Sequence, residues 1–210
     1  RLHGITCGLA TASDRAYDPR RVWGFLDCGP FETEEELGGS FIFDKRADFA
    51  AFAIVENLTD QLLGVVMLSN DDPWNLSIQL EPPVVKPRAE GTVEQIEACF
   101  LLVDRLFALG YRRVQLAVDT KDVGGKKLAG RLGFTHEATL PKHMIVKEAN
   151  RDSNIYGMLN SDWDRGARAY MYKKLHGAEL QKADGAKYVK EGEWEAQVKR
   201  HQEKKAAEAE

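Results

Sequence analysis

The feature that most constrains the fold is a long amphipathic helix predicted over residues 92–109. Its apolar side chains recur at helical spacing: Val93, Ile96, Phe100, Val103 and Phe107. Thr92 and Gln95 have the spacing of a capping box, in which the Thr92 hydroxyl accepts a hydrogen bond from the backbone. Leu109-Gly110 ends the pattern. Such a helix must bury its apolar face against a second layer of structure.

Strand-like runs precede this helix. Residues 49–55 and 63–69 are rich in apolar residues, and turn residues between them predict a hairpin. A third run, residues 76–85, contains the pair Pro82-Pro83. Because proline cannot donate a ladder hydrogen bond, this strand must bulge, splay or end there.

More elements follow the helix. We expect a strand over residues 112–118, a helix over residues 122–134 ended by Gly133, and three strands over residues 136–140, 142–148 and 155–159. Strands on both sides of one long helix predict a mixed α+β fold around one sheet.

Composition limits the class of protein. The 210 residues are 43% hydrophobic and 30% charged, which suits a globular domain with a sizeable core. The net charge of −4 argues against nucleic acid as a partner. No apolar run reaches the roughly 20 residues of a membrane span. Three cysteines without metal-ligand spacing predict free thiols, no metal site and a reducing compartment, either cytoplasm or organelle matrix.

Several segments resemble one known family. They are "CGPFETEEEL" (28–37), "LGYRRVQLAVD" (109–119), "AGRLGF" (129–134), "HMIVKEANRDSNIYGML" (143–159) and "SDW" (161–163). Together they resemble the GNAT acetyltransferase superfamily, most of all its Rim-type branch, the ribosomal-protein N-terminal acetyltransferases. The resemblance predicts a GNAT-like domain over residues 22–163, with an N-terminal extension over residues 1–21. Residues 164–210, rich in Lys, Glu and Ala, predict a charged helical extension able to attach protein partners.

The resemblance implies a mixed sheet that splays apart to hold acetyl-CoA. It also implies transfer of the acetyl group to an amine, on a small molecule or a protein N-terminus. The cofactor pyrophosphate would lie on backbone N–H groups at the start of the long helix. The candidate cofactor-binding residues are Val85, Gly91, Thr92, Val93, Lys126, Lys127 and Arg131.

The predicted cofactor loop departs from the family pattern. Pro87 and Thr92 match, but Glu90-Gly91 stands where the pattern has glutamine and arginine. Val93 replaces a second arginine, and Glu94 replaces a small residue. A carboxylate close to a bound phosphate would cost about 1 kcal/mol in a partly screened site. The loop is therefore a divergent version of the family's.

The candidate site residues have alternative interpretations. Gly91 would either admit the pyrophosphate or relax a turn. Asp119 and Asp122 are candidate catalytic or cofactor-contacting groups, or helix caps. Asp122 and Gly125 stand where the family has asparagine and serine. The basic residues of the second helix would hold the 3′-phosphate of the cofactor or face solvent. Two functions follow: an acetyl-CoA-dependent N-acetyltransferase, or a non-catalytic GNAT-fold subunit of an assembly.

Overall fold

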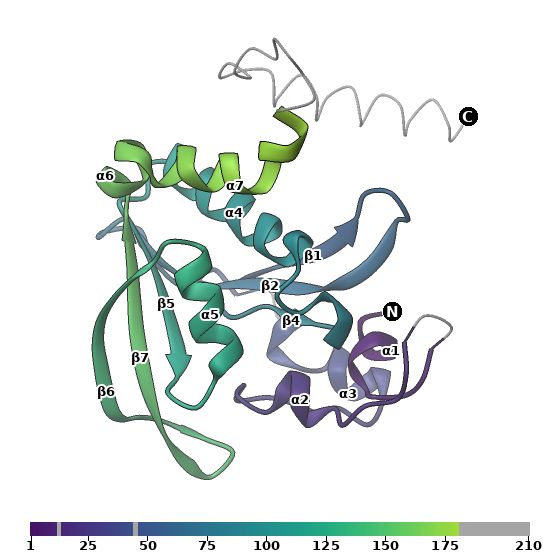
Figure 1. Cartoon of the computed structure of the whole chain (residues 1–210). Coiled ribbons are helices and arrows are strands. Elements are labelled where there is room, and N and C mark those ends of the chain that lie inside the picture. Colours follow the sequence, from purple (N-terminus) through teal and green to yellow (C-terminus); the bar gives the residue numbers. More distant parts are fainter. Residues whose placement is uncertain (12–13, 44–45, 181–210) are drawn as a thin grey trace. The chain divides into compact units, whose positions relative to one another are not determined.

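The computed structural model describes residues 1–11, 14–43 and 46–180 (Figure 1). By its internal contacts the chain divides into two units, residues 1–175 and residues 176–210. The first unit holds the sheet and every site described below. The predicted extension beyond residue 180 lies outside the described residues.

A mixed sheet forms the centre of the first unit, with strands in the order β1-β2-β3-β5-β7-β6 and β4 paired to β2. The strands are β1 (Ala50–Glu56), β2 (Gln61–Asp72), β3 (Ser77–Leu80), β4 (Val84–Val85), β5 (Arg113–Asp119), β6 (Thr135–Val146) and β7 (Ala149–Leu159). The predicted hairpin of β1 and β2 is confirmed, as their strands pair antiparallel.

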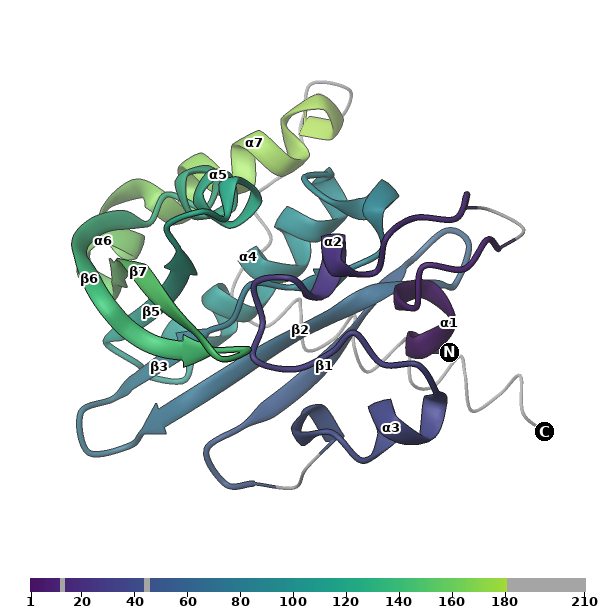
Figure 2. The ribbon, with the colours of Figure 1, turned by 90° about the horizontal axis from the view of Figure 1, so that it is seen from below.

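The sheet opens where β3 leaves β5. These two strands are parallel and pair over only three residues, from Ser77↔Arg113 to Gln79↔Gln115. Beyond Pro82-Pro83 the chain continues as β4, which pairs with β2, whereas β5 continues along β7. The two halves of the sheet therefore diverge (Figures 1 and 2). This confirms the predicted α+β class with a splayed mixed sheet.

Helices cover both faces of the sheet. They are α1 (Leu2–Thr6), α2 (Arg20–Trp23), α3 (Glu34–Gly38), α4 (Val93–Ala108), α5 (Val123–Arg131), α6 (Asn160–Asp162) and α7 (Arg168–Leu180), with short turns η1 (Phe41–Phe43), η2 (Pro87–Ala89) and η3 (Trp163–Ala167). Side chains along β2 contribute in turn to two hydrophobic cores, one on each face of the sheet, because successive side chains of a strand point to opposite faces. Val66 belongs to the core that includes residues of α4 and α5, and Met67 belongs to the core that includes Trp23 of α2 and Leu37 of α3.

The long helix begins at Val93 as predicted, but its predicted cap is wrong. Thr92 has the extended backbone of an N-cap, yet its hydroxyl donates to the Ala89 carbonyl at 3.0 Å instead of accepting from the helix. Gln95 reaches back one residue further than a capping box requires, and its Oε1 accepts from the Gly91 N–H at 2.6 Å. The apolar stripe is buried at Ile96, Phe100 and Val103, whereas Val93 is 55% exposed.

Two predicted strands are one. Residues 136–140 and 142–148 lie within or beside the single strand β6, whose register against β7 shifts between Leu140 and Met144. Pro141 lies in that shift. The irregularity does not end the strand, because β6 is at the edge of the sheet and its outer backbone groups have no partner to lose.

The ends of the unit are tied to its core. Near the C-terminal end, Trp163 and Met171 are buried beside α4, and Trp163 Nε1 donates to Asp104 at 3.1 Å. At the N-terminal end, Trp23 Nε1 donates to the Thr6 carbonyl at 3.1 Å. All three cysteines are free, as predicted. None of the described helices is both long and apolar enough to cross a membrane.

Candidate active site

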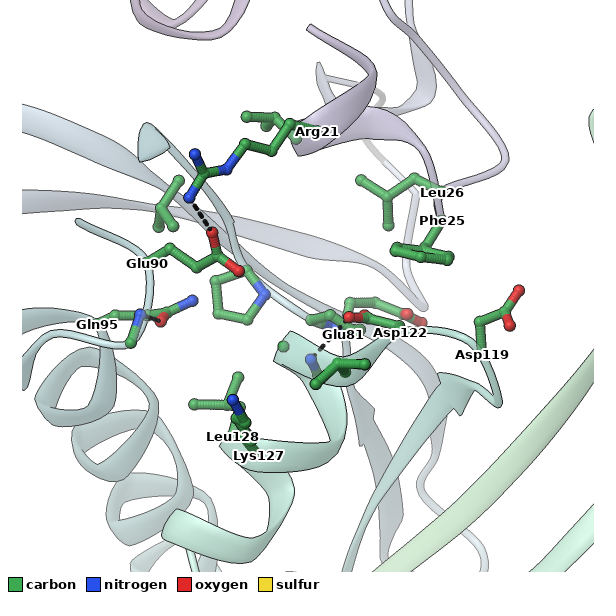
Figure 3. Close-up of a pocket in the computed structure, with 18 of the residues that line it drawn as sticks. Arg21, Phe25, Leu26, Glu81, Glu90, Gln95, Asp119, Asp122, Lys127 and Leu128 are labelled. Carbon is green, nitrogen blue, oxygen red and sulfur yellow. Dashed lines mark hydrogen bonds and ion pairs between the residues drawn. The ribbon is translucent and has the colours of Figure 1, made fainter. Parts of the chain in front are cut away.

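A cavity of about 690 Å³ lies where the two halves of the sheet diverge. Its walls come from α2, from the bulged segment between β3 and β4, from the end of β5 and from the first turns of α4 and α5 (Figure 3). It is lined by cationic side chains, namely Arg20, Arg21, Lys121, Lys127, Arg131 and Arg151, and by carboxylates, namely Glu81, Glu90, Asp119 and Asp122. Cations therefore outnumber anions around it.

The α5 end of the cavity is shaped by Asp122 and two glycines. The Asp122 side chain accepts from the Gly125 N–H at 2.9 Å, which is the N-cap interaction. Burial raises the pKa of Asp122, and the nearby Glu90 and Asp119 charges raise it further, while hydrogen bonds from the backbone oppose them. Asp119 accepts from the Lys121 N–H at 2.7 Å. Both carboxylates line the cavity, and both already serve the turn into α5.

At the α4 end of the cavity, the polar backbone groups of Gly91 already have partners within the protein. Gly91 has a φ of +70°, a conformation that glycine adopts without strain. Its N–H is taken by Gln95, and its carbonyl accepts from Arg131 NH1. Glu94 is exposed and does not line the cavity. The backbone at this junction is therefore already hydrogen-bonded to side chains of the protein.

The structure brings together some of the predicted cofactor residues and not others. Val85, Gly91, Lys127 and Arg131 line the cavity. Thr92, Val93 and Lys126 do not, and Lys126 Nζ instead donates to the Thr120 carbonyl at 2.8 Å.

Several cavity residues were missed by sequence reasoning. Glu81 is half-buried, and its Oε1 accepts from Ser69 Oγ at 2.5 Å and from Gln79 Nε2 at 2.6 Å. A carboxylate directly before the proline pair was the available signal. Arg151 connects β5 to the segment after α2, because its guanidinium donates to the carbonyls of Ala117 at 3.0 Å and Phe25 at 3.5 Å. Arg21 reaches the cavity from α2, and no local pattern indicates this.

The arrangement suits a polyanionic ligand with an apolar or neutral arm. The arm would lie in the opening between β4 and β5. These two strands do not pair with each other, so backbone groups that face the opening can meet a ligand. Phe25, Leu26, Pro82 and Pro83 line the cavity with apolar surface. Within the described ranges, no group of three or more metal-ligating side chains lies close enough to hold a metal ion.

Comparison with known proteins shows the class of fold. No known family profile and no curated protein matches the chain. Among solved structures, a probable acetyltransferase (GNAT family) from Chromobacterium violaceum matches with a TM-score of 0.68 and 28% identity, over 78% of each chain. A GCN5-related N-acetyltransferase from Brucella melitensis has a TM-score of 0.68 and 24% identity, over 81% of this chain and 76% of the other. The acetyltransferase (GNAT family) from Bacillus anthracis has a TM-score of 0.62 at 15% identity, over 76% and 87%.

The fold is therefore the GNAT fold, and the cavity lies at the point where its sheet opens.

Proposed function

We propose that the protein is a GNAT-superfamily N-acetyltransferase that uses acetyl-CoA to acetylate an amine. The observation that carries this proposal is the position of the cavity, which lies in the splay of the sheet and meets the N-terminal turns of two helices. Helix N-termini favour anions, and Lys127 and Arg131 add positive charge at the same place. The residues present thus fit a ligand that joins phosphates to a thin neutral arm.

Bound acetyl-CoA would supply a thioester carbonyl to the acceptor amine. Glu81 is the best placed of the described carboxylates to hold the proton that the amine gives up, because it lines the cavity beside the opening and is not used as a helix cap. Ser69 and Gln79 hold its side chain in place. Phe25 and Leu26 lie across the cavity from the α5 side and keep water from the reacting groups (Figure 3).

The Rim-type segments of the sequence favour a protein N-terminus as acceptor over other amines, and a small amine remains the alternative within the same reaction. In this proposal residues 22–163 carry most of the catalytic domain, Arg20 and Arg21 of the N-terminal extension complete its cavity, and residues 164–210 attach protein partners.

A specific observation favours a second candidate, a non-catalytic binding subunit. The Gly91 N–H, which the cradle would offer to a phosphate, is already occupied by Gln95, and Glu90 places a carboxylate inside the cavity.

Calorimetry with acetyl-CoA, followed by a thiol-release assay with N-terminal peptides and small amines, separates the two candidates. Micromolar binding and thiol release are expected for the enzyme. No heat at millimolar acetyl-CoA, with the protein folded, would establish the non-catalytic candidate.

Three variants then locate the base. Glu81→Gln keeps an oxygen for Ser69 and Gln79 but cannot take up a proton, so kcat should fall about a hundredfold or more while acetyl-CoA affinity is kept. Asp119→Asn tests one of the two other candidates, and Asp122→Asn tests the second. If Asp119→Asn lost activity and Glu81→Gln did not, the role would belong to Asp119.

A further inference from the structure

The loop between β4 and α4, residues 86–91, is tied to the N-terminal segment through all of its charged side chains. Lys86 and Arg88 both pair with Asp14, and Glu90 pairs with Arg21. The N-terminal segment thus meets the loop at two points, one buried and one at the cavity. We call this segment, residues 14–21, the N-terminal clamp.

The buried point is the Asp14 contact. The Lys86 side chain is 3% exposed and that of Asp14 is 11% exposed, with Lys86 Nζ 3.7 Å from Asp14 Oδ2. Arg88 Nε lies 3.2 Å from Asp14 Oδ1. A buried ammonium group without a partner is strongly destabilising, so the pair with Asp14 holds Lys86 in place and with it the direction in which the loop leaves β4.

The second point is at the cavity. Arg21 NH2 lies 3.0 Å from Glu90 Oε2, and both residues line the cavity (Figure 3). The other Glu90 oxygen lies over the first turn of α5, only 2.9 Å from where a Cβ on Gly124 would be. The Glu90 carboxylate therefore occupies the place at which a helix N-terminus attracts an anion, and Arg21 is the cation that faces it.

We propose that the N-terminal clamp is part of the cofactor site, with Arg21 as a phosphate-binding residue and Asp14 as a positioning residue for the loop. This inference rests on the proposed function. A cofactor phosphate takes the place of the Glu90 carboxylate beside Arg21, and Glu90 turns into solvent. The clamp in this way supplies a positive charge of the kind that the divergent loop lacks at Gly91 and Val93.

The test of Arg21 compares two ligands that differ in their phosphates. Acetyl-CoA carries them, and S-acetylpantetheine has the same thioester arm without them. Arg21→Ala should weaken acetyl-CoA binding about tenfold, measured by calorimetry, and leave S-acetylpantetheine binding unchanged. Glu90→Gln should tighten acetyl-CoA binding, because it removes the anion that competes for Arg21. Arg165→Ala removes an equal charge at a side chain that is 76% exposed and outside the cavity, and should change neither ligand.

The role of Asp14 is tested by removing its charge, first alone and then together with the charge of Lys86. Asp14→Asn leaves Lys86 buried without its anion, and should raise KM for acetyl-CoA more than it lowers kcat. Adding Lys86→Met removes the unpaired charge, and should restore the melting temperature if Asp14→Asn proves unstable. The proposal predicts that the double variant melts like the wild type and still binds acetyl-CoA weakly. Such a result would mean that the weak binding comes from the position of the loop and not from loss of stability.

Failure of this inference differs from failure of the proposed function. Wild-type protein that binds neither ligand contradicts the function. Wild-type protein that binds acetyl-CoA, with Arg21→Ala binding it equally well, overturns the role of Arg21 and leaves the function standing. Equal loss of both ligands in Arg21→Ala also overturns it, because the effect would then not involve phosphate.

Discussion

Two helix N-termini face the same cavity and satisfy their backbone donors in different ways. At the start of α5, Asp122 accepts from the Gly125 N–H three residues further on. At the start of α4, the candidate cap Thr92 turns its hydroxyl back to Ala89, and Gln95 and Arg131 take the polar groups of Gly91. The α5 cap is made by one side chain within its own turn, whereas the α4 junction combines local partners with Arg131, which comes from α5.

The difference teaches where a capping pattern can be trusted. Every helix start leaves N–H groups without helical partners, and the nearest competent acceptor satisfies them. At the start of α5, Asp122 supplies the acceptor for the Gly125 N–H from three residues away, and Glu90 also lies over this turn. Beside α4, Arg131 and the N-terminal clamp hold the loop, and the Thr92 hydroxyl bonds to the Ala89 carbonyl instead of to the helix.

The largest expected effect is at Gly125, which makes the α5 start possible. A Cβ at this position would lie 2.5 Å from Asp122 Oδ2 and 2.7 Å from Val118 Cγ1. Gly125→Ala should therefore lower the free energy of unfolding by about 2 kcal/mol, measured by denaturant titration. Gly130→Ala, on the same helix with open space around it, should be neutral or stabilising by up to about 1 kcal/mol. Equal effects of the two changes would show that the tight packing at Gly125 is unimportant.

The next effect is at Asp122 itself. Asp122→Ala removes the cap and should cost about 1 kcal/mol. Asp122→Asn keeps an acceptor for Gly125 and removes a buried charge, so at pH 7 it should be at least as stable as the wild type.

The pH dependence of Asp122 follows from its raised pKa. The folded protein holds this proton more tightly than the unfolded chain, so the group makes stability decrease as pH rises from the ordinary value of 3.8 through the higher folded pKa. Melting curves between pH 3 and pH 7 should show the wild type losing stability relative to Asp122→Asn as the pH rises, because the other carboxylates are common to both proteins. Identical profiles would contradict the raised pKa.

The smallest effect is expected at Thr92. Its hydroxyl donates to the Ala89 carbonyl, also contacts the Glu94 carboxylate and caps no helix N–H group, so Thr92→Ala should cost only about 0.5 kcal/mol. Gln95→Ala removes a bond from a buried side chain and should cost more. A larger loss at Thr92 than at Gln95 would restore the capping box that the sequence indicates.

Local patterns in the sequence determined most of the elements. The spacing of Ile96, Phe100 and Val103 predicted α4, and Pro82-Pro83, which cannot donate ladder hydrogen bonds, predicted that the strand bulges, splays or ends there. Both follow from residues that lie next to one another in the chain. The segments resembling the GNAT superfamily predicted the class of fold, and the class is confirmed.

Only the tertiary structure decided which side chains meet around the cavity. Arg21 pairs with Glu90 across 69 residues, and Arg131 reaches Gly91 across 40. Nothing in the periodicity of either segment predicts these contacts, because they depend on how α2 and α5 pack against the sheet. The same is true of Glu81, whose surroundings come from a neighbouring strand. Residues adjacent in sequence determine helices and strands, whereas packing of the whole chain determines which charges share a cavity.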